Sequence, residues 1–234
     1  MTKELFREDG YLKSCSAVVA SVGDDGVSFD QTVFYPMGGG QPGDTGVMRR
    51  SDGSENRIID TRKDAEGNHL HILEYPGGAP EAGEQVELEL DWDRRYRMMR
   101  LHSCMHMLCA AVPAGVTGGS ISEDRARLDF DLQDPLDKQA VTEKLNDLVL
   151  KDAPMSLRWI SDEELEANPE LVRTMSVKPP MGSGRVRLVN FEGIDLQPCG
   201  GTHVASSGEI GRVKVQKIEK KGKHNRRVIV VFDD

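Results

Sequence analysis

The chain has 234 residues, 38% of them hydrophobic and 29% charged, and its formal net charge at pH 7 is −9. This length allows one large domain or two small ones. The lack of an apolar run of roughly 18–20 residues, or of a secretory signal, leads us to expect a cytoplasmic protein without a membrane partner. The acidic balance argues against nucleic-acid binding over the whole surface, and the four cysteines are expected as buried side chains or metal ligands rather than disulfides.

Residues 1–92 have the pattern of a small β-barrel domain. Short segments of alternating hydrophobic and polar residues are separated by turns rich in glycine and aspartate. Several short strands with regular turns are typical of a barrel, and no helical period interrupts them. The expected strands lie in SAVVASVG, GVSFDQTVFY, GVMRRSDG, HLHILEY and EQVELELDW.

The segment FYPMGGGQPGDTG, residues 34–46, is unusually rich in glycine. It differs from a phosphate-binding P-loop, because no GK[ST] sequence follows it and no helix is predicted to begin there. Its three consecutive glycines permit positive φ angles and the close approach of a substrate or of another backbone. Composition alone favours a long hairpin loop.

A helix is predicted from Arg94 to Val112, a stretch without glycine or proline. Residues 93–234 as a whole combine helices with strands, so we expect an α+β protein whose second domain is a two-layer α/β unit. Asp134 is expected to cap a second helix, with Pro135 in its first position. Further expected elements are the strands ARLDFDL, SLRWI and GRVRLVNF, a capping box of Ser161 with Glu164, and a final hairpin of EIGRVKVQKIEK and RRVIVVF.

Two clusters of positive charge lie within this acidic chain. They are either solvated faces of a helix and of a strand pair, or local surfaces for phosphate groups. The clusters are Arg94, Arg95, Arg97 and Arg100 on the first helix, and Arg212, Lys214, Lys217, Lys220, Lys221, Lys223, Arg226 and Arg227 near the C-terminus.

Two short motifs contain the residue types that bind zinc. His102 and His106 are four residues apart on the predicted helix, so both imidazoles lie on one face and can reach one ion. Cys199 and His203 flank two glycines and a threonine, and the glycines let the backbone turn tightly around a metal. Three imidazoles and one thiolate suit tetrahedral zinc, and the two motifs together favour a metal site more than either does alone.

Other residues of these types are expected to be structural. A thermolysin-like peptidase is disfavoured, because its motif needs glutamate directly after the first histidine and this chain has Ser103 there. His69 and His71 alternate in a predicted strand, and Cys104 and Cys109 are expected in the core.

Taken together, these segments resemble the alanyl-tRNA editing family, which includes the AlaX proteins and the editing region of alanyl-tRNA synthetases. The resemblance covers nearly the whole chain, from about Phe34 to Phe232. No class II synthetase catalytic domain precedes the motifs, so the chain resembles a free-standing editing protein of the medium-length AlaX type. The matching segments are FYPMGGGQPGDTG, DWDRRYRMMRLHSCMHML, GGSISEDRARLDFD and LQPCGGTHVASSGEIGRVKVQKIEKKGKHNRRV.

The family resemblance implies a translation-factor-like β-barrel followed by a zinc-binding editing domain. It implies hydrolysis of seryl-tRNA(Ala) with Zn²⁺ as the cofactor, and it leaves open whether glycyl-tRNA(Ala) is also cleaved. The partner is then the acceptor stem and the charged 3′ end of tRNA(Ala), contacted by the basic C-terminal stretch. No protein partner is evident.

Several residues acquire expected roles from this resemblance. The family has a polar residue near position 117 that helps to recognise the serine hydroxyl, and the resemblance assigns this role to Thr117. The glycine-rich loop, with Gly39, Gly40 and Gln41, is expected to bind the substrate, although Gln41 is equally a solvent-facing loop residue. Asp195 is expected either to orient the loop that carries the zinc-binding cysteine or to be an ordinary turn-forming aspartate.

The chemistry leaves alternatives open. Four protein ligands fill a tetrahedral shell, so a catalytic zinc needs either a displaced ligand or a fifth position, or else it only positions the substrate while the tRNA's own hydroxyl activates water. Two other functions fit the same motifs: editing of a threonyl-type tRNA, and a zinc-stabilised tRNA-binding module without catalysis.

Overall fold

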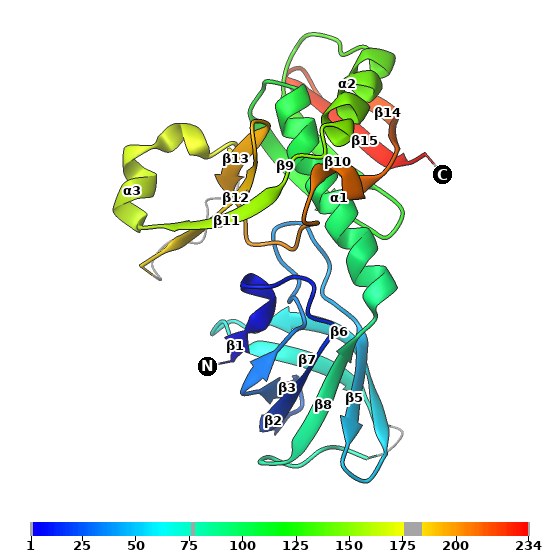
Figure 1. Cartoon of the computed structure of the whole chain (residues 1–234), viewed down its shortest axis with the longest axis vertical. Coiled ribbons are helices and arrows are strands. Elements are labelled where there is room, and N and C mark those ends of the chain that lie inside the picture. The colour runs from blue at the N-terminus through cyan, green and yellow to red at the C-terminus, as the bar shows by residue number, and fades with distance from the viewer. Residues whose placement is uncertain (1, 76–77, 176–183, 234) are drawn as a thin grey trace. The chain divides into compact units, whose positions relative to one another are not determined.

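The computed structural model describes residues 2–75, 78–175 and 184–233, and the chain divides into two compact units, Met1–Arg97 and Met98–Asp234 (Figure 1). The division falls within helix α1, Trp92–Ala111. In the part of the chain that the structure describes, no helix is long and apolar enough to cross a membrane.

A closed six-stranded barrel dominates the first unit, and its strand order is β2-β3-β7-β6-β5-β8. The predicted α+β class with a barrel is thus confirmed. Alternate side chains of each strand fill the interior, among them Val19, Phe29 and Leu88, which are at most 1% exposed. The barrel strands are β2 (Ser14–Gly23), β3 (Gly26–Phe29), β5 (Gly46–Arg50), β6 (Glu55–Lys63), β7 (His69–Glu74) and β8 (Gln85–Leu90), and the short elements β1 (Lys3–Glu4), η1 (Leu5–Arg7) and β4 (Gln31–Thr32) accompany them.

Strand β6 was not among the predicted strands. Its inward positions include Asn56 and Thr61 beside Ile58, and all three side chains are buried. Because two of its buried side chains are polar, β6 lacks the alternation of hydrophobic and polar residues from which the other strands are predicted.

The glycine-rich segment forms a loop between β4 and β5. Gly39 and Gly40 have φ angles of 56° and 82°, which glycine adopts without steric cost. The backbones of Gly38 and Gln41 pair across this turn. Gln41 is only 1% exposed, so the solvent-facing alternative for this residue is wrong.

Asp44 closes the end of this loop. Its carboxylate accepts a hydrogen bond from the Tyr35 amide at 2.6 Å and forms a buried ion pair with Arg95, which lies in the first turns of α1. Arg95 therefore supports the barrel unit and is not a solvated cation.

The second unit contains two antiparallel sheets around the remainder of α1. One sheet has the order β14-β15-β10-β9, and the other has the order β11-β12-β13. Helix α2 packs on β14, and Leu165 of α3 covers one face of the smaller sheet. The elements are β9 (Val116–Ile121), β10 (Ala126–Asp131), α2 (Lys138–Leu150), β11 (Met155–Ile160), α3 (Asp162–Ala167), η2 (Pro169–Leu171), β12 (Val186–Phe191), β13 (Asp195–Pro198), η3 (Ser207–Ile210), β14 (Val213–Lys220) and β15 (Asn225–Phe232).

The predicted start of the second helix is wrong by one turn. Helix α2 begins at Lys138, and the Asp137 carboxylate, not that of Asp134, caps it by accepting from the Ala140 amide at 2.7 Å. Both aspartates precede helix-forming residues, and the choice depends on how Val141 and Leu145 reach the core. The predicted capping box at α3 is confirmed.

Candidate metal centre

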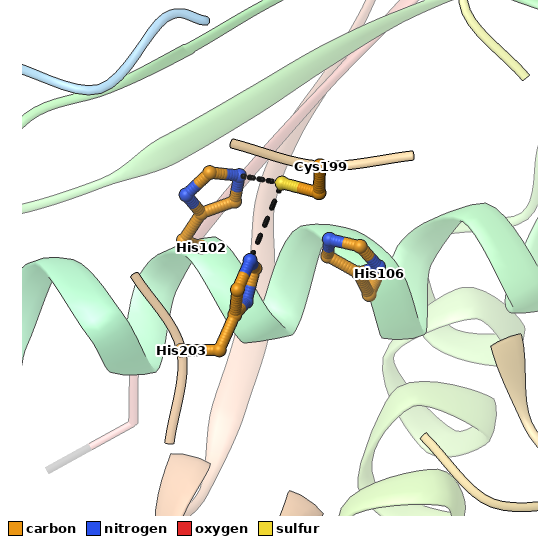
Figure 2. A group of neighbouring side chains, drawn as sticks. All are labelled: His102, His106, Cys199 and His203. Atoms are coloured by element: carbon orange, nitrogen blue, oxygen red, sulfur yellow. Dashed lines mark hydrogen bonds between the residues drawn. The ribbon is translucent and has the colours of Figure 1, made fainter. Parts of the chain in front are cut away.

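Helix α1 and the loop after β13 bring four potential metal ligands together. His102 and His106 project from the same face of α1, and Cys199 and His203 approach them from the loop (Figure 2). One ligand atom from each side chain lies within 4.8 Å of all the others. The structure thus brings together the four residues that the two sequence motifs predict as ligands.

The distances within this cluster fit a tetrahedral ion. Cys199 Sγ lies 3.4 Å from His102 Nε2 and 3.3 Å from His203 Nε2. For zinc with ordinary Zn–S and Zn–N bonds, a tetrahedral angle places sulfur and nitrogen about 3.5 Å apart. The donor set also fits, because thiolate and imidazole are ligands that zinc prefers.

The electrostatics of the cluster favour a thiolate. Burial raises the pKa of the Cys199 thiol, but the charge of the facing His102 and the hydrogen bonds with His102 and His106 outweigh burial and hold this pKa well below its usual value. Burial lowers the pKa of His203 well below its usual value, which keeps this imidazole neutral. A thiolate beside a neutral imidazole is the protonation state in which both residues bind a metal.

Two of the imidazoles are fixed through the nitrogen that faces away from the cluster. His106 Nδ1 lies 2.8 Å from Asp195 Oδ2, and Gln197 donates to the same oxygen at 2.7 Å. His203 Nδ1 lies 3.2 Å from the Ser103 hydroxyl. Because the Nδ1 atoms of His106 and His203 are engaged in this way, both rings are held in orientation with their Nε2 atoms facing the cluster.

Arg187 holds the loop that carries Cys199. Its side chain donates to the carbonyl oxygens of Cys199, at 2.9 Å, and of Gly201. The Cys199 amide in turn donates to the Arg187 carbonyl at 3.1 Å. Gly200 has no positive φ, and a Cβ atom there would meet nothing within 4 Å. The hydrogen bonds of Arg187, rather than an unusual conformation of Gly200, therefore shape this turn.

Comparison with known proteins places this site in a family. Residues 7–94 match the model of class II (A) tRNA synthetases, and residues 186–229, which include Cys199 and His203, match the threonyl and alanyl tRNA synthetase second additional domain. An alanyl-tRNA editing protein AlaX-M of Methanosarcina barkeri is 38% identical over the whole of both chains. The chain belongs to the AlaX-M family of alanyl-tRNA editing proteins.

Other relatives agree with this AlaX-M assignment. An AlaX-M protein of Saccharolobus solfataricus is 34% identical over 97% of this chain and 98% of its own length. An alanine–tRNA ligase of Pyrobaculum calidifontis is 34% identical over 94% of this chain, which matches only 25% of the ligase. This chain therefore spans the full length of AlaX-M relatives and about a quarter of the ligase.

The structure places the substrate-binding residues that the AlaX-M resemblance predicts, but it does not test their roles. The Thr117 hydroxyl on β9 lies 3.1 Å from the Asp129 carbonyl and 3.0 Å from Asn225 Oδ1. Gly39, Gly40 and Gln41 belong to the first unit. All four assignments stay predictions.

The positive clusters are largely engaged within the molecule. On α1, Arg94 donates to the Gly43 carbonyl at 2.7 Å, and Arg100 donates to the Ile210 carbonyl at 2.9 Å and lies 4.0 Å from the Phe232 ring centroid. Five of the C-terminal cations form ion pairs with acidic side chains. Arg227 pairs with Asp129, Lys217 and Lys221 pair with Glu219, and Arg212 and Lys214 pair with Asp233.

Sequence reasoning missed Ser103, Gln197, Arg187 and Arg173 around this AlaX-M metal centre. Arg173 lies 3.8 Å from Asp195 Oδ1, a buried oxygen without a hydrogen bond to any described residue. The CGGTH motif indicates the candidate ligands Cys199 and His203, but not the residues that surround them. The single available signal was the i, i+2 spacing of Asp195 and Gln197, which places both on one face of a strand.

Proposed function

We propose that this protein is a trans-editing hydrolase that cleaves the ester of seryl-tRNA(Ala), with glycyl-tRNA(Ala) as a second substrate to be tested, at a zinc centre formed by His102, His106, Cys199 and His203. The observation that carries the proposal is the convergence of these four ligands, from two distant segments, in a chain of the AlaX-M family. Threonyl-tRNA editing is the second candidate, because the model matched by residues 186–229 describes both threonyl and alanyl enzymes.

The residues of the site have separate tasks in this proposal. The four residues would hold a zinc ion, which would supply Lewis acidity and positive charge toward the ester carbonyl. Asp195 accepts from His106 Nδ1–H and fixes its tautomer, and Arg187 holds the Cys199 loop at its carbonyl oxygens. Phe191, whose ring centroid is 5.8 Å from that of His106, excludes water behind the imidazoles.

The substrate preference has a physical reason. Serine exceeds alanine by one hydroxyl group, and a pocket that hydrogen-bonds this hydroxyl rejects alanine, because the buried polar groups of the pocket would otherwise lose their partner. Glycine lacks this hydroxyl too, so the contact accounts for the seryl ester and not for the glycyl ester. We propose Thr117 for this contact and Gln41, Gly39 and Gly40 as further substrate-binding residues. The partner is tRNA(Ala), and we place the protein in the cytoplasm, where the tRNAs of translation are charged and used.

We further propose that the two domains are residues 1–92, a barrel with the glycine-rich loop, and residues 93–234, the editing domain. The ranges of the two matching family models support this assignment. The first model ends at residue 94, close to the proposed boundary, and the second model, residues 186–229, lies within the second domain.

Deacylation assays with the wild type and Cys199→Ala test the function. The wild type is expected to cleave seryl-tRNA(Ala) and to spare alanyl-tRNA(Ala), while Cys199→Ala, folded by circular dichroism, loses bound zinc and at least a hundredfold in rate. Cys15→Ala is the matched control, since Cys15 is a half-buried thiol of the barrel unit. It should behave as the wild type.

Other outcomes discriminate between the alternatives. Cleavage of seryl-tRNA(Thr) in preference to seryl-tRNA(Ala) would favour the threonyl type. A protein that binds zinc and tRNA but cleaves neither ester would be a binding module, and the proposal would be rejected.

A further inference from the structure

Strand β11 carries a partly exposed tryptophan, Trp159, in the small sheet that borders the candidate metal centre. Trp159 is opposite Arg187 in the β11–β12 ladder, and Arg187 binds the Cys199 loop through its backbone carbonyl and its side chain. Trp159, Arg187 and Cys199 thus form one row that crosses the three strands at one end of the smaller sheet. Because neighbouring strands are about 4.8 Å apart, the Trp159 backbone lies roughly 10 Å from that of Cys199.

The side chains of Trp159 and Arg187 extend from the sheet face that supports the metal centre. Gln197, which contacts the Asp195–His106 pair, is in register with Val189, and Val189 alternates with Arg187 on the same face of β12. The opposite face is the apolar one, where Ile160 and its neighbours form a buried cluster under α3. Trp159 is not a member of that cluster and remains partly exposed.

An exposed guanidinium stacks on this indole. Arg185, directly before β12, lies 4.4 Å from the Trp159 ring centroid. A single residue separates it from Arg187, so both arginines and the tryptophan share one face. An aromatic ring and an exposed guanidinium plane are groups that bind unpaired nucleotides, through base stacking and phosphate contacts.

We propose that Trp159 and Arg185 form a stacking platform for the unpaired nucleotides at the 3′ end of the tRNA substrate. This inference rests on the proposed function, in which the ester on the terminal ribose is at the metal centre. Stacked nucleotides are spaced about 3.4 Å apart, so the last two or three nucleotides span the distance from the metal centre to Trp159. The positive charge of Arg185, an exposed residue, complements the phosphates of this segment.

Steady-state kinetics of seryl-tRNA(Ala) deacylation test the platform. In Trp159→Leu, which keeps an apolar side chain, KM is expected to rise about tenfold while kcat stays near the wild-type value, because one base stack is lost and the metal centre is intact. Trp159→Phe should restore most of the affinity, and Arg185→Ala should raise KM by a smaller factor. Arg158→Ala is the matched control, since this exposed arginine is adjacent on β11 but belongs to the opposite face.

Fluorescence provides a readout that does not depend on hydrolysis. The chain has two tryptophans, so Trp92→Phe leaves Trp159 as the only tryptophan emitter. Titration with a short uncharged RNA ending in CCA is expected to quench this emission, and a double-stranded RNA of equal length without the overhang is not.

The outcomes separate the two proposals. If the wild type cleaves seryl-tRNA(Ala) but Trp159→Leu keeps the wild-type KM and the RNA quenches nothing, the platform is rejected and the proposed function stands. If the RNA quenches Trp159 in a protein that cleaves no ester, the proposed function fails while the nucleotide site is retained. A simple structural cation–π pair would lower the melting temperature of Arg185→Ala without changing KM.

Discussion

At the candidate metal centre, Asp195 does more to define the ligand geometry than its place in the sequence suggests. Its carboxylate is buried, contacts His106 Nδ1 and accepts from Gln197. The convergence of the four candidate ligands was predictable, because helical spacing and a short Cys–His loop are visible in the sequence. Ser103, Gln197 and Arg187 were not, because each acts on a residue that only the fold brings near, such as His203, 100 residues from Ser103.

Replacing the Asp195 carboxylate should therefore weaken metal binding without unfolding the chain. In Asp195→Asn the amide keeps the volume but has no negative charge to hold the His106 ring and its tautomer. The zinc dissociation constant is expected to increase about ten- to a hundredfold. Competition with a chromophoric chelator measures this constant.

Asp131→Asn serves as the control for that measurement, since Asp131 is an exposed carboxylate on β10. An unchanged zinc dissociation constant in Asp195→Asn would show that the contact with His106 contributes nothing to the site.

Among the elements, those with a strong period or a complete cap were predictable. Helix α1 and the α3 capping box follow from spacing alone, whereas β6 was hidden by the buried polar residues Asn56 and Thr61. Strand β13 has four residues and acquires its identity from pairing with β12. Local sequence does not specify an element whose stability depends on its neighbours in the sheet.

The start of α2 provides a test with an internal control. Asp137 accepts from the Ala140 amide, so Asp137→Ala is expected to lower the free energy of unfolding by about 1 kcal/mol. Asp134→Ala, three residues earlier and exposed, should change it by less than about 0.5 kcal/mol. Urea unfolding of both variants measures the two free energies of unfolding. A loss in Asp134→Ala as large as that in Asp137→Ala would show that Asp137 is not the distinctive cap of α2.

On the scale of the whole molecule, the barrel unit contains buried groups that make its stability depend on pH. His69 and His71 stack with ring centroids 5.0 Å apart, and His71 is also in contact with the rings of Phe29 and Phe34. Burial lowers the pKa of His69, and burial together with the neighbouring His69 lowers the pKa of His71 well below its ordinary value of 6.5. Both imidazoles are therefore neutral in the folded chain near neutral pH.

Acid should destabilise the protein first through these histidines. As the pH falls below 6.5, the unfolded chain binds protons that the folded chain excludes, so the free energy of unfolding falls. Above pH 6.5 both states are neutral at these positions and the effect disappears. The urea midpoint at pH 5 is expected below that at pH 7.

Two variants identify the source of this pH dependence. His71→Phe should reduce the difference between pH 5 and pH 7, although it lowers stability at both, because Thr32 and the Val27 carbonyl lose a partner. His224→Ala removes an exposed histidine and should leave the difference unchanged. An identical pH profile in His71→Phe and the wild type would assign the effect to other groups.

Ser103 has a consequence for how this chain compares with metallopeptidases of the HExxH type. Its fully buried hydroxyl accepts from the Val204 amide and contacts His203, so it ties helix α1 to the loop that carries half of the metal ligands. A peptidase motif of the HExxH type differs here by one amino acid, with a glutamate that faces the substrate as a base. In this protein the same position points into the interior and has a structural partner. The two motifs differ by one residue in sequence, but the side chain at this position is part of the packing between α1 and the loop here and a base facing the substrate in the peptidases.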